Sequence, residues 1–145
     1  MFLGTYEHTM DAKGRVVMPR KFRDLLEAGC VITKGREHCL AVYPPEAWEQ
    51  EYERVNSAPS TDTNARLYRR SLFAGASDVV PDKQGRIPVP ENLRVWAQMG
   101  KDITVVGSGE VVEIWASDVW AAEEAKADDF FSGGEQVVGR SGEVL

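Results

Sequence analysis

The sequence of 145 residues has few of the side chains that build metal, disulfide and membrane structures. It contains two cysteines, Cys30 and Cys39, and two histidines, His8 and His38, without the CxxC spacing typical of zinc sites. No apolar run approaches the roughly 18 residues that a membrane helix needs. The first residues, MFLGTYEH, contain no basic leader. We therefore expect a cytosolic protein with reduced, packed thiols and no bound metal.

Sequence patterns of catalysis are also absent. There is no phosphate-cradling P-loop, and no Ser/His/Asp or Cys/His arrangement indicates a nucleophile with its base. Two DxxGR turns each offer a carboxylate beside an arginine, which makes a poor general base. We expect neither an enzyme nor a cofactor, and no small-molecule substrate is evident.

Charge is distributed unevenly along the chain. The formal net charge is −6, but residues 11–23, DAKGRVVMPRKFR, contain five cations and a single carboxylate. Residues 118–145 contain seven carboxylates and two cations. The acidic balance therefore comes mainly from the C-terminal end, and the N-terminal run is a local basic cluster that could contact a polyanion.

The chain repeats itself at an offset of 71 residues. DAKGRVVMPRKFRDLLEAGCVIT aligns with DKQGRIPVPENLRVWAQMGKDIT. The two copies share the same residue at five of the aligned positions that matter most here, which are Asp11/Asp82, Gly14/Gly85, Arg15/Arg86, Pro19/Pro90 and Arg23/Arg94. After a one-residue shift, LAVYPPEAW faces VEIWASDVW. Two copies of one unit make up most of the protein.

Each copy predicts the order strand, turn, strand, short helix, strand, strand, helix. A glycine forms the turn, a proline begins the short helix and a second glycine ends it, at Gly14, Pro19 and Gly29 and again at Gly85, Pro90 and Gly100. RVVM, CVIT and LAVY, and RIPV, DITVVG and VVEIW, have the β-branched and aromatic content of strands. PPEAWEQEYERV and ASDVWAAEEAKA are typical of helices.

One unit of this size buries too little surface to be stable alone. We therefore predict an α+β, mainly β fold in which the two repeats form an intramolecular pseudo-dimer. The expected divisions are repeat 1 at residues 5–47, a helical linker at 48–75, repeat 2 at 76–119, and a C-terminal helix end with a mobile acidic tail at 120–145. Within the linker, NARLYRRSLFAG predicts a helix and NSAPSTDT a flexible connection.

The segments MFLG, DAKGRVVMPRKFR, DKQGRIPVP and VEIWASDVW, read together, resemble the MraZ family of bacterial regulators with tandem SpoVT/AbrB-like repeats. The resemblance covers about residues 1–125. It implies the AbrB-type swapped-hairpin, or double-split, β-barrel with short flanking helices. It also implies a homo-oligomer in the form of a closed ring, association with the nucleoid, and repression through direct repeats in the promoter of the division and cell-wall gene cluster.

The basic turns are the candidate DNA-binding site. Phosphates dominate DNA affinity, so cations on a rigid turn are effective, and an arginine can also bind guanine in a bidentate manner. The candidate residues are Lys13, Gly14, Arg15, Arg20 and Lys21 in the first copy and Lys83 and Arg86 in the second. The second copy has Gln84, Glu91 and Asn92 in place of three of these cations. The first repeat is therefore expected to make most of the contact.

Other interpretations of these residues remain open. Asp11 and Arg15 could pair across the turn and only stabilise the hairpin. The cations that follow Pro19 could instead face a neighbouring subunit. Arg23 and Arg94 are equivalent in both copies, which suits a structural ion pair better than sequence recognition. The alternative function is a non-catalytic interaction or antidote-like module that shares the fold.

Overall fold

The structure is a computed structural model that describes residues 1–133, and its elements follow the predicted order. Repeat 1 consists of β1 (Thr5–Thr9), β2 (Arg15–Val17), α1 (Arg20–Leu26), β3 (Cys30–Lys34), the 3-10 turn η1 (Arg36–His38), β4 (Leu40–Tyr43) and α2 (Pro45–Asn56). After α3 (Thr63–Ala74), repeat 2 consists of β5 (Ser77–Val79), β6 (Arg86–Pro88), α4 (Glu91–Trp96), β7 (Asp102–Gly107), β8 (Val112–Ala116) and α5 (Ser117–Gly133). The predicted strands and helices are thus confirmed.

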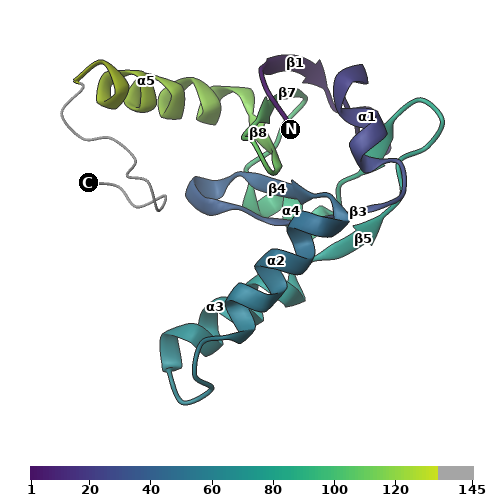
Figure 1. Cartoon of the computed structure of the whole chain (residues 1–145). Coiled ribbons are helices and arrows are strands. Elements are labelled where there is room, and N and C mark those ends of the chain that lie inside the picture. The colour runs from purple at the N-terminus through teal and green to yellow at the C-terminus, as the bar shows by residue number, and fades with distance from the viewer. Residues whose placement is uncertain (134–145) are drawn as a thin grey trace.

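The two repeats are intertwined in one antiparallel sheet (Figure 1). The strand order is β1-β7-β8-β4-β3-β5, and β2 pairs with β6 in a separate two-stranded ribbon. Each repeat gives its first strand to the other repeat, because β1 pairs with β7 and β5 pairs with β3. The predicted α+β fold of two tandem repeats is confirmed. In residues 1–133 the sheet runs from β1 to β5 without closing on itself, so the closed barrel stays a prediction.

A large hydrophobic core joins the repeats. Apolar positions 71 residues apart are buried together, and these pairs are Val16/Ile87, Met18/Val89, Phe22/Leu93, Leu26/Ala97 and Ile32/Ile103. Each half therefore completes the core of the other, which explains how units with such short elements form a stable fold.

The two short helices begin alike and end differently. Pro19 and Pro90 directly precede α1 and α4, as predicted. Gly29 has φ +120° just after α1. After α4, however, Gln98 takes the left-handed conformation at φ 55°, and the Met99 amide donates to a carbonyl of α4. The prediction that Gly100 ends this helix is therefore wrong.

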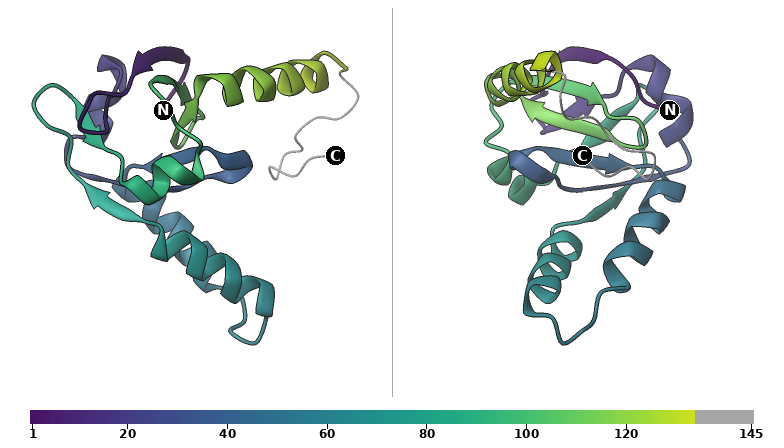
Figure 2. Two further views of the ribbon diagram at one scale, coloured as in Figure 1. Left: turned by 180° about the vertical axis from the view of Figure 1, so that it is seen from behind. Right: turned by 60° about the vertical axis from the view of Figure 1, so that its left-hand side comes forward.

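Two helical parts project from the sheet and diverge, with α5 at the top and the α2–α3 pair at the bottom of both views (Figure 2). α2 and α3 form an antiparallel hairpin in which Trp48 and Tyr52 pack on Phe73, and Asp62 caps α3. α5 leaves the end of β8, and its first residues pack on Trp115. It extends to Gly133, further than the sequence pattern predicted. The rest of the expected tail, 134–145, lies outside the described residues.

In residues 1–133, no helix is both long and apolar enough to span a membrane.

Candidate nucleic-acid interface

The first basic turn is held together by one carboxylate. Asp11 Oδ1 accepts hydrogen bonds from the backbone amides of Lys13 and Arg15, both at 2.9 Å. Asp11 Oδ2 accepts a further bond from Arg15 Nε at 2.8 Å. The carbonyl of Asp11 also accepts from the Gly14 amide at 3.0 Å. The turn is therefore fixed before any ligand binds, and Arg15 is part of the structure that fixes it.

The second turn repeats this arrangement. Asp82 Oδ1 accepts from the amides of Gln84 and Arg86 at 3.0 and 2.9 Å, and its Oδ2 accepts from Arg86 Nε at 2.6 Å. Arg15 Nη1 also lies 4.0 Å from Asp82 Oδ2. The pairing of aspartate and arginine that the sequence left as an alternative is thus present in both repeats, and the two turns lie close to each other.

Backbone hydrogen bonds on both carboxylates affect their protonation. The hydrogen bond from the Arg15 amide is the largest effect on the pKa of Asp11 and lowers it. Partial burial opposes this, but the Arg15 side chain and the Lys13 amide lower the pKa further, so that the pKa is below its usual value. The pKa of Asp82 is lowered in the same way by Arg86 and Gln84. Both carboxyl groups therefore stay ionised at neutral pH, and the turns keep their shape.

Each turn is covered by an arginine from the other repeat. Gly14 has φ +75°, and a Cβ there would overlap the Arg94 guanidinium. A Cβ on Gly85, at φ +78°, would overlap Arg23. Arg23 Nε donates to the carbonyl of Met18 at 3.1 Å, and Arg94 Nη1 donates to that of Val89 at 2.9 Å. Arg23 and Arg94 are therefore structural, as expected, but they bind carbonyl groups rather than a carboxylate.

The structure separates the candidate residues into supporting and exposed ones. Gly14 is buried and Arg15 and Arg86 are half-buried. The exposed cations are Lys13, on the turn, and Arg20 and Lys21, at the start of α1, together with Lys83 in the second repeat. The residues that replace three of them in repeat 2, Gln84, Glu91 and Asn92, are also exposed. The two repeats therefore present similar backbones with different surface charge.

Arg94 is a residue whose position the sequence analysis missed. Together with Lys13 and the turn backbone it lines a hollow of about 260 Å³ beside the first turn. The alignment showed that a distal arginine recurs in both copies, but not that each arginine crosses to the turn of the other copy. This crossing follows from the pairing of β2 with β6, which a local pattern does not encode.

The remaining chemically versatile side chains are engaged elsewhere. The His38 ring stacks on Trp96 with centroids 4.4 Å apart, and Cys30 and Cys39 are buried free thiols. In residues 1–133, no three His, Cys, Asp or Glu side chains gather in a way that could hold a metal ion.

Fold and site together define a tandem-repeat protein whose shared core displays two equivalent turns, one of them strongly basic. The sequence profile of the family described as "MraZ protein, putative antitoxin-like" matches residues 1–71 and again residues 72–140. The chain belongs to this MraZ family.

Individual relatives match over nearly the whole chain, and each is named "Transcriptional regulator MraZ". The protein of Micrococcus luteus is 46% identical over 132 residues, which are 91% of this chain and 92% of the relative. That of Carboxydothermus hydrogenoformans is 45% identical over 83% of this chain and 84% of its own. That of Salinispora tropica is 44% identical over 95% and 97%.

Proposed function

We propose that this protein is a DNA-binding transcriptional regulator that contacts duplex DNA through the basic turn of repeat 1. The observation that carries this proposal is that different residues of this region support the turn and present charge to the solvent. Asp11 and Arg15 fix its backbone, while Lys13, Arg20 and Lys21 stay exposed. Cations on a rigid element lose little conformational freedom on binding, so they bind phosphates effectively. The names of the relatives support the same function.

Each candidate residue has a proposed part in this contact. Lys13, Arg20 and Lys21 bind phosphates as exposed cations. Arg15 uses Nε for Asp11 and has Nη1 4.0 Å from Asp82 Oδ2. Its Nη2 is therefore the nitrogen best placed to reach a phosphate or a guanine acceptor. Gly14 contributes the left-handed backbone that shapes the turn. Lys83 and Arg86 make a weaker contact from the second repeat.

The proposed operator is a set of direct repeats in the promoter ahead of the division and cell-wall genes, where the protein acts as a repressor. A closed ring of several subunits presents one basic turn per subunit to successive repeats. Because linked contacts raise the effective concentration, avidity adds a factor of roughly 10² to 10⁴ over one turn. Binding of this kind places the protein on the nucleoid.

We also propose that the sheet and the β2–β6 ribbon form the swapped-hairpin barrel of the AbrB type. The exchange of β1 and β5 between the repeats supports this, as does the large core that they share.

The test replaces three exposed cations of repeat 1 with the residues found at the equivalent positions of repeat 2. The triple variant Lys13→Gln, Arg20→Glu and Lys21→Asn gives the first repeat the residues of the second repeat without touching Asp11 or the buried positions. The chain's own upstream DNA is titrated by fluorescence anisotropy at several salt concentrations. Loss of three phosphate contacts lowers the slope of log affinity against log salt by roughly 3. An unchanged slope and affinity would refute the proposed site.

The opposite variant is the matched control. Gln84→Lys, Glu91→Arg and Asn92→Lys on repeat 2 add the same cations to the same backbone, so we expect tighter binding and a steeper salt dependence. Alanine at Arg15 is a poorer test because it also removes the ion pair of the turn. If the wild type binds its upstream DNA no better than random DNA, the alternative of a non-catalytic interaction module, in line with the antitoxin-like family description, is favoured.

A further inference from the structure

Helix α5 has a long part whose side chains are exposed in the described chain. At 17 residues it is about 25 Å long, and every residue from Glu124 to Gly133 is exposed. Phe130 and Phe131, near its end, are 55% and 86% exposed. With Ala127 they occupy positions i, i+3 and i+4, so they form one apolar patch. Adjacent exposed aromatic rings at the end of a projecting helix indicate a contact surface.

The internal repeat shows what α5 lacks. α2 follows β4 as α5 follows β8, so the two helices are equivalent. α2 is covered by α3, whose Phe73 packs on Trp48 and Tyr52 with centroids 5.7 Å apart in both pairs. Within the described residues, α5 has no such covering helix (Figures 1 and 2). A helix supplied from outside the chain would complete the symmetry.

The outer face of α3 is an exposed surface of matching chemistry. It presents Leu67, 57% exposed, and Tyr68, 36% exposed, between polar positions. The exposed residues of the helix are Thr63, Asn64, Leu67, Tyr68, Arg70, Ser71 and Ala74. The helix contains three arginines and no carboxylate. In contrast, residues 121–133 of α5 carry four carboxylates against Lys126. The two helices are therefore complementary in both charge and apolar character.

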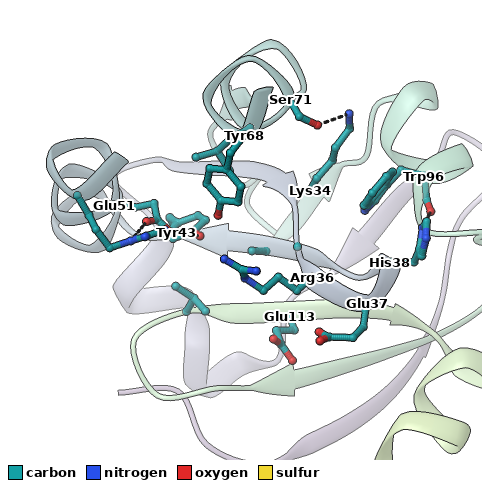
Figure 3. Close-up of a pocket in the computed structure, with 15 residues that line it drawn as sticks. Lys34, Arg36, Glu37, His38, Tyr43, Glu51, Tyr68, Ser71, Trp96 and Glu113 are labelled. Atoms are coloured by element: carbon teal, nitrogen blue, oxygen red, sulfur yellow. Dashed lines mark hydrogen bonds and ion pairs between the residues drawn. The ribbon is translucent and has the colours of Figure 1, made fainter. Parts of the chain in front are cut away.

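Cations beside α3 strengthen this complementarity (Figure 3). Lys34 Nζ donates to Ser71 Oγ at 3.0 Å, and the Arg36 guanidinium lies 5.5 Å from the centroid of Tyr68. No ion pair within the described residues involves Lys34, Arg36 or Arg70. Tyr68 also lines a cavity of about 620 Å³ next to the helix, which gives an aromatic ring space to enter. The carboxylates Glu37, Glu51 and Glu113 also line this cavity. Of these, Glu51 is already paired with Arg54 at 2.6 Å.

A second apolar hollow is a poorer match. It lies beside β5 and α2 and is lined by Trp48, Val79 and Val80, but it also contains Glu49 and Asp78. These carboxylates would repel the acidic end of α5. The residues that line this hollow include no Lys or Arg, whereas Lys34, Arg36 and Arg54 balance the three carboxylates of the cavity beside α3. Charge therefore favours the α3 face.

We propose that α5 of one copy packs against the outer face of α3 in a second copy of this chain, with Phe130 and Phe131 against Leu67 and Tyr68. Because α5 leads away from its own sheet (Figure 1), its exposed end is free to reach a second copy. The contact joins two different surfaces, so it is head-to-tail, and repetition of it closes a ring when the rotation allows. This inference rests on the oligomer of the proposed function and names the surfaces that would build it.

Two variants of the full-length chain, each blocking one surface, test the proposal. Phe131→Glu adds a charge to the α5 patch, and Leu67→Glu adds one to the α3 face. Both side chains are exposed, so the fold is retained, which a thermal melt verifies. By native mass spectrometry we expect a multi-subunit wild type and single chains for each variant. A 1:1 mixture is expected to give a species of two chains, because one intact pair of surfaces remains and the outer two are blocked.

The matched control is Val80→Glu, which places the same charge at a residue 68% exposed in the other hollow and is expected to keep the wild-type mass. A wild-type mass for Phe131→Glu or Leu67→Glu overturns the proposal, and so does a mixture that stays monomeric. If the wild type itself is a single chain, the ring of the proposed function fails as well. Affinity for a duplex that contains one repeat tests the proposed DNA contact separately from assembly, because this contact needs only the basic turn of one subunit.

Discussion

The turn glycine Gly14 provides a direct test of how the repeats support each other. Its φ of +75° is in the left-handed region, and a Cβ would overlap the Arg94 guanidinium. Gly14→Ala therefore forces an unfavourable backbone conformation, which costs about 1–2 kcal/mol. It also displaces an arginine that donates to the Val89 carbonyl at 2.9 Å, and the loss of such a charged hydrogen bond costs about 1.5–3 kcal/mol.

Together these two effects lower the free energy of unfolding by roughly 2.5–5 kcal/mol. Gly100→Ala is the matched control, because nothing lies within 4 Å of the site of its added Cβ. Urea unfolding is followed by tryptophan fluorescence at one fixed protein concentration, since assembly would otherwise shift the midpoint. The reasoning is refuted if Gly14→Ala and Gly100→Ala unfold within about 0.5 kcal/mol of each other.

A double-mutant cycle then isolates the contact across the repeats. In an Arg94→Ala background the guanidinium is gone, so Gly14→Ala retains only the backbone cost and should be less damaging by about 1 kcal/mol or more. Equal costs in both backgrounds would mean that the loss comes from the turn conformation alone.

Two further predictions concern titration. Burial, and then the charge of Arg23, lowers the pKa of His8, whose Nε2 is buried without a partner in the described structure. The contribution of His8 to the free energy of unfolding is therefore present above the pKa of an unfolded histidine, about 6.5, and is lost as the pH falls below it. In His8→Gln, the midpoint of urea unfolding should therefore decrease less than in the wild type when the pH is lowered from about 7 to about 5. The same decrease in both proteins would contradict this. Burial raises the pKa of Cys30 to about 11 and also raises that of Cys39, so iodoacetamide should label these thiols quickly only in denaturant, and fast labelling of the folded protein would disprove their burial.

The internal repeat made much of the fold predictable from the sequence. A recurring Asp, Gly, Arg and Pro fixed the turn, strand and helix starts twice, and agreement between the copies strengthened each assignment. Strand pairing between the repeats was not predictable in this way. A local pattern indicates which face of β1 is apolar, but it does not show whether β1 pairs within its own repeat or with β7.

The same limit applies to the candidate site. Composition singled out Lys13, Arg20 and Lys21, and the structure finds all three exposed. The roles of Arg23 and Arg94 depend on contacts across the fold, so only their structural character was predictable. The extent of α5 was underestimated because its end, DDFFSG, is polar and glycine-terminated, which resembles a tail. The helix-favouring run before it instead continues through Phe131 to Gly133, the last described residue.

Fusion of two copies in one chain explains how the turns can differ while the fold stays symmetric. The residues that support the turns recur in both repeats, because each repeat needs the arginine of the other to cover its glycine. The exposed cations bear no such constraint. Repeat 2 has Gln84 at the position of Lys13, and its turn keeps the same hydrogen bonds. A dimer of identical short chains would have to carry the same charge on both turns. A fused chain can concentrate cations on one turn and leave the other as support, and a ring of such chains would then present a single basic turn from each subunit.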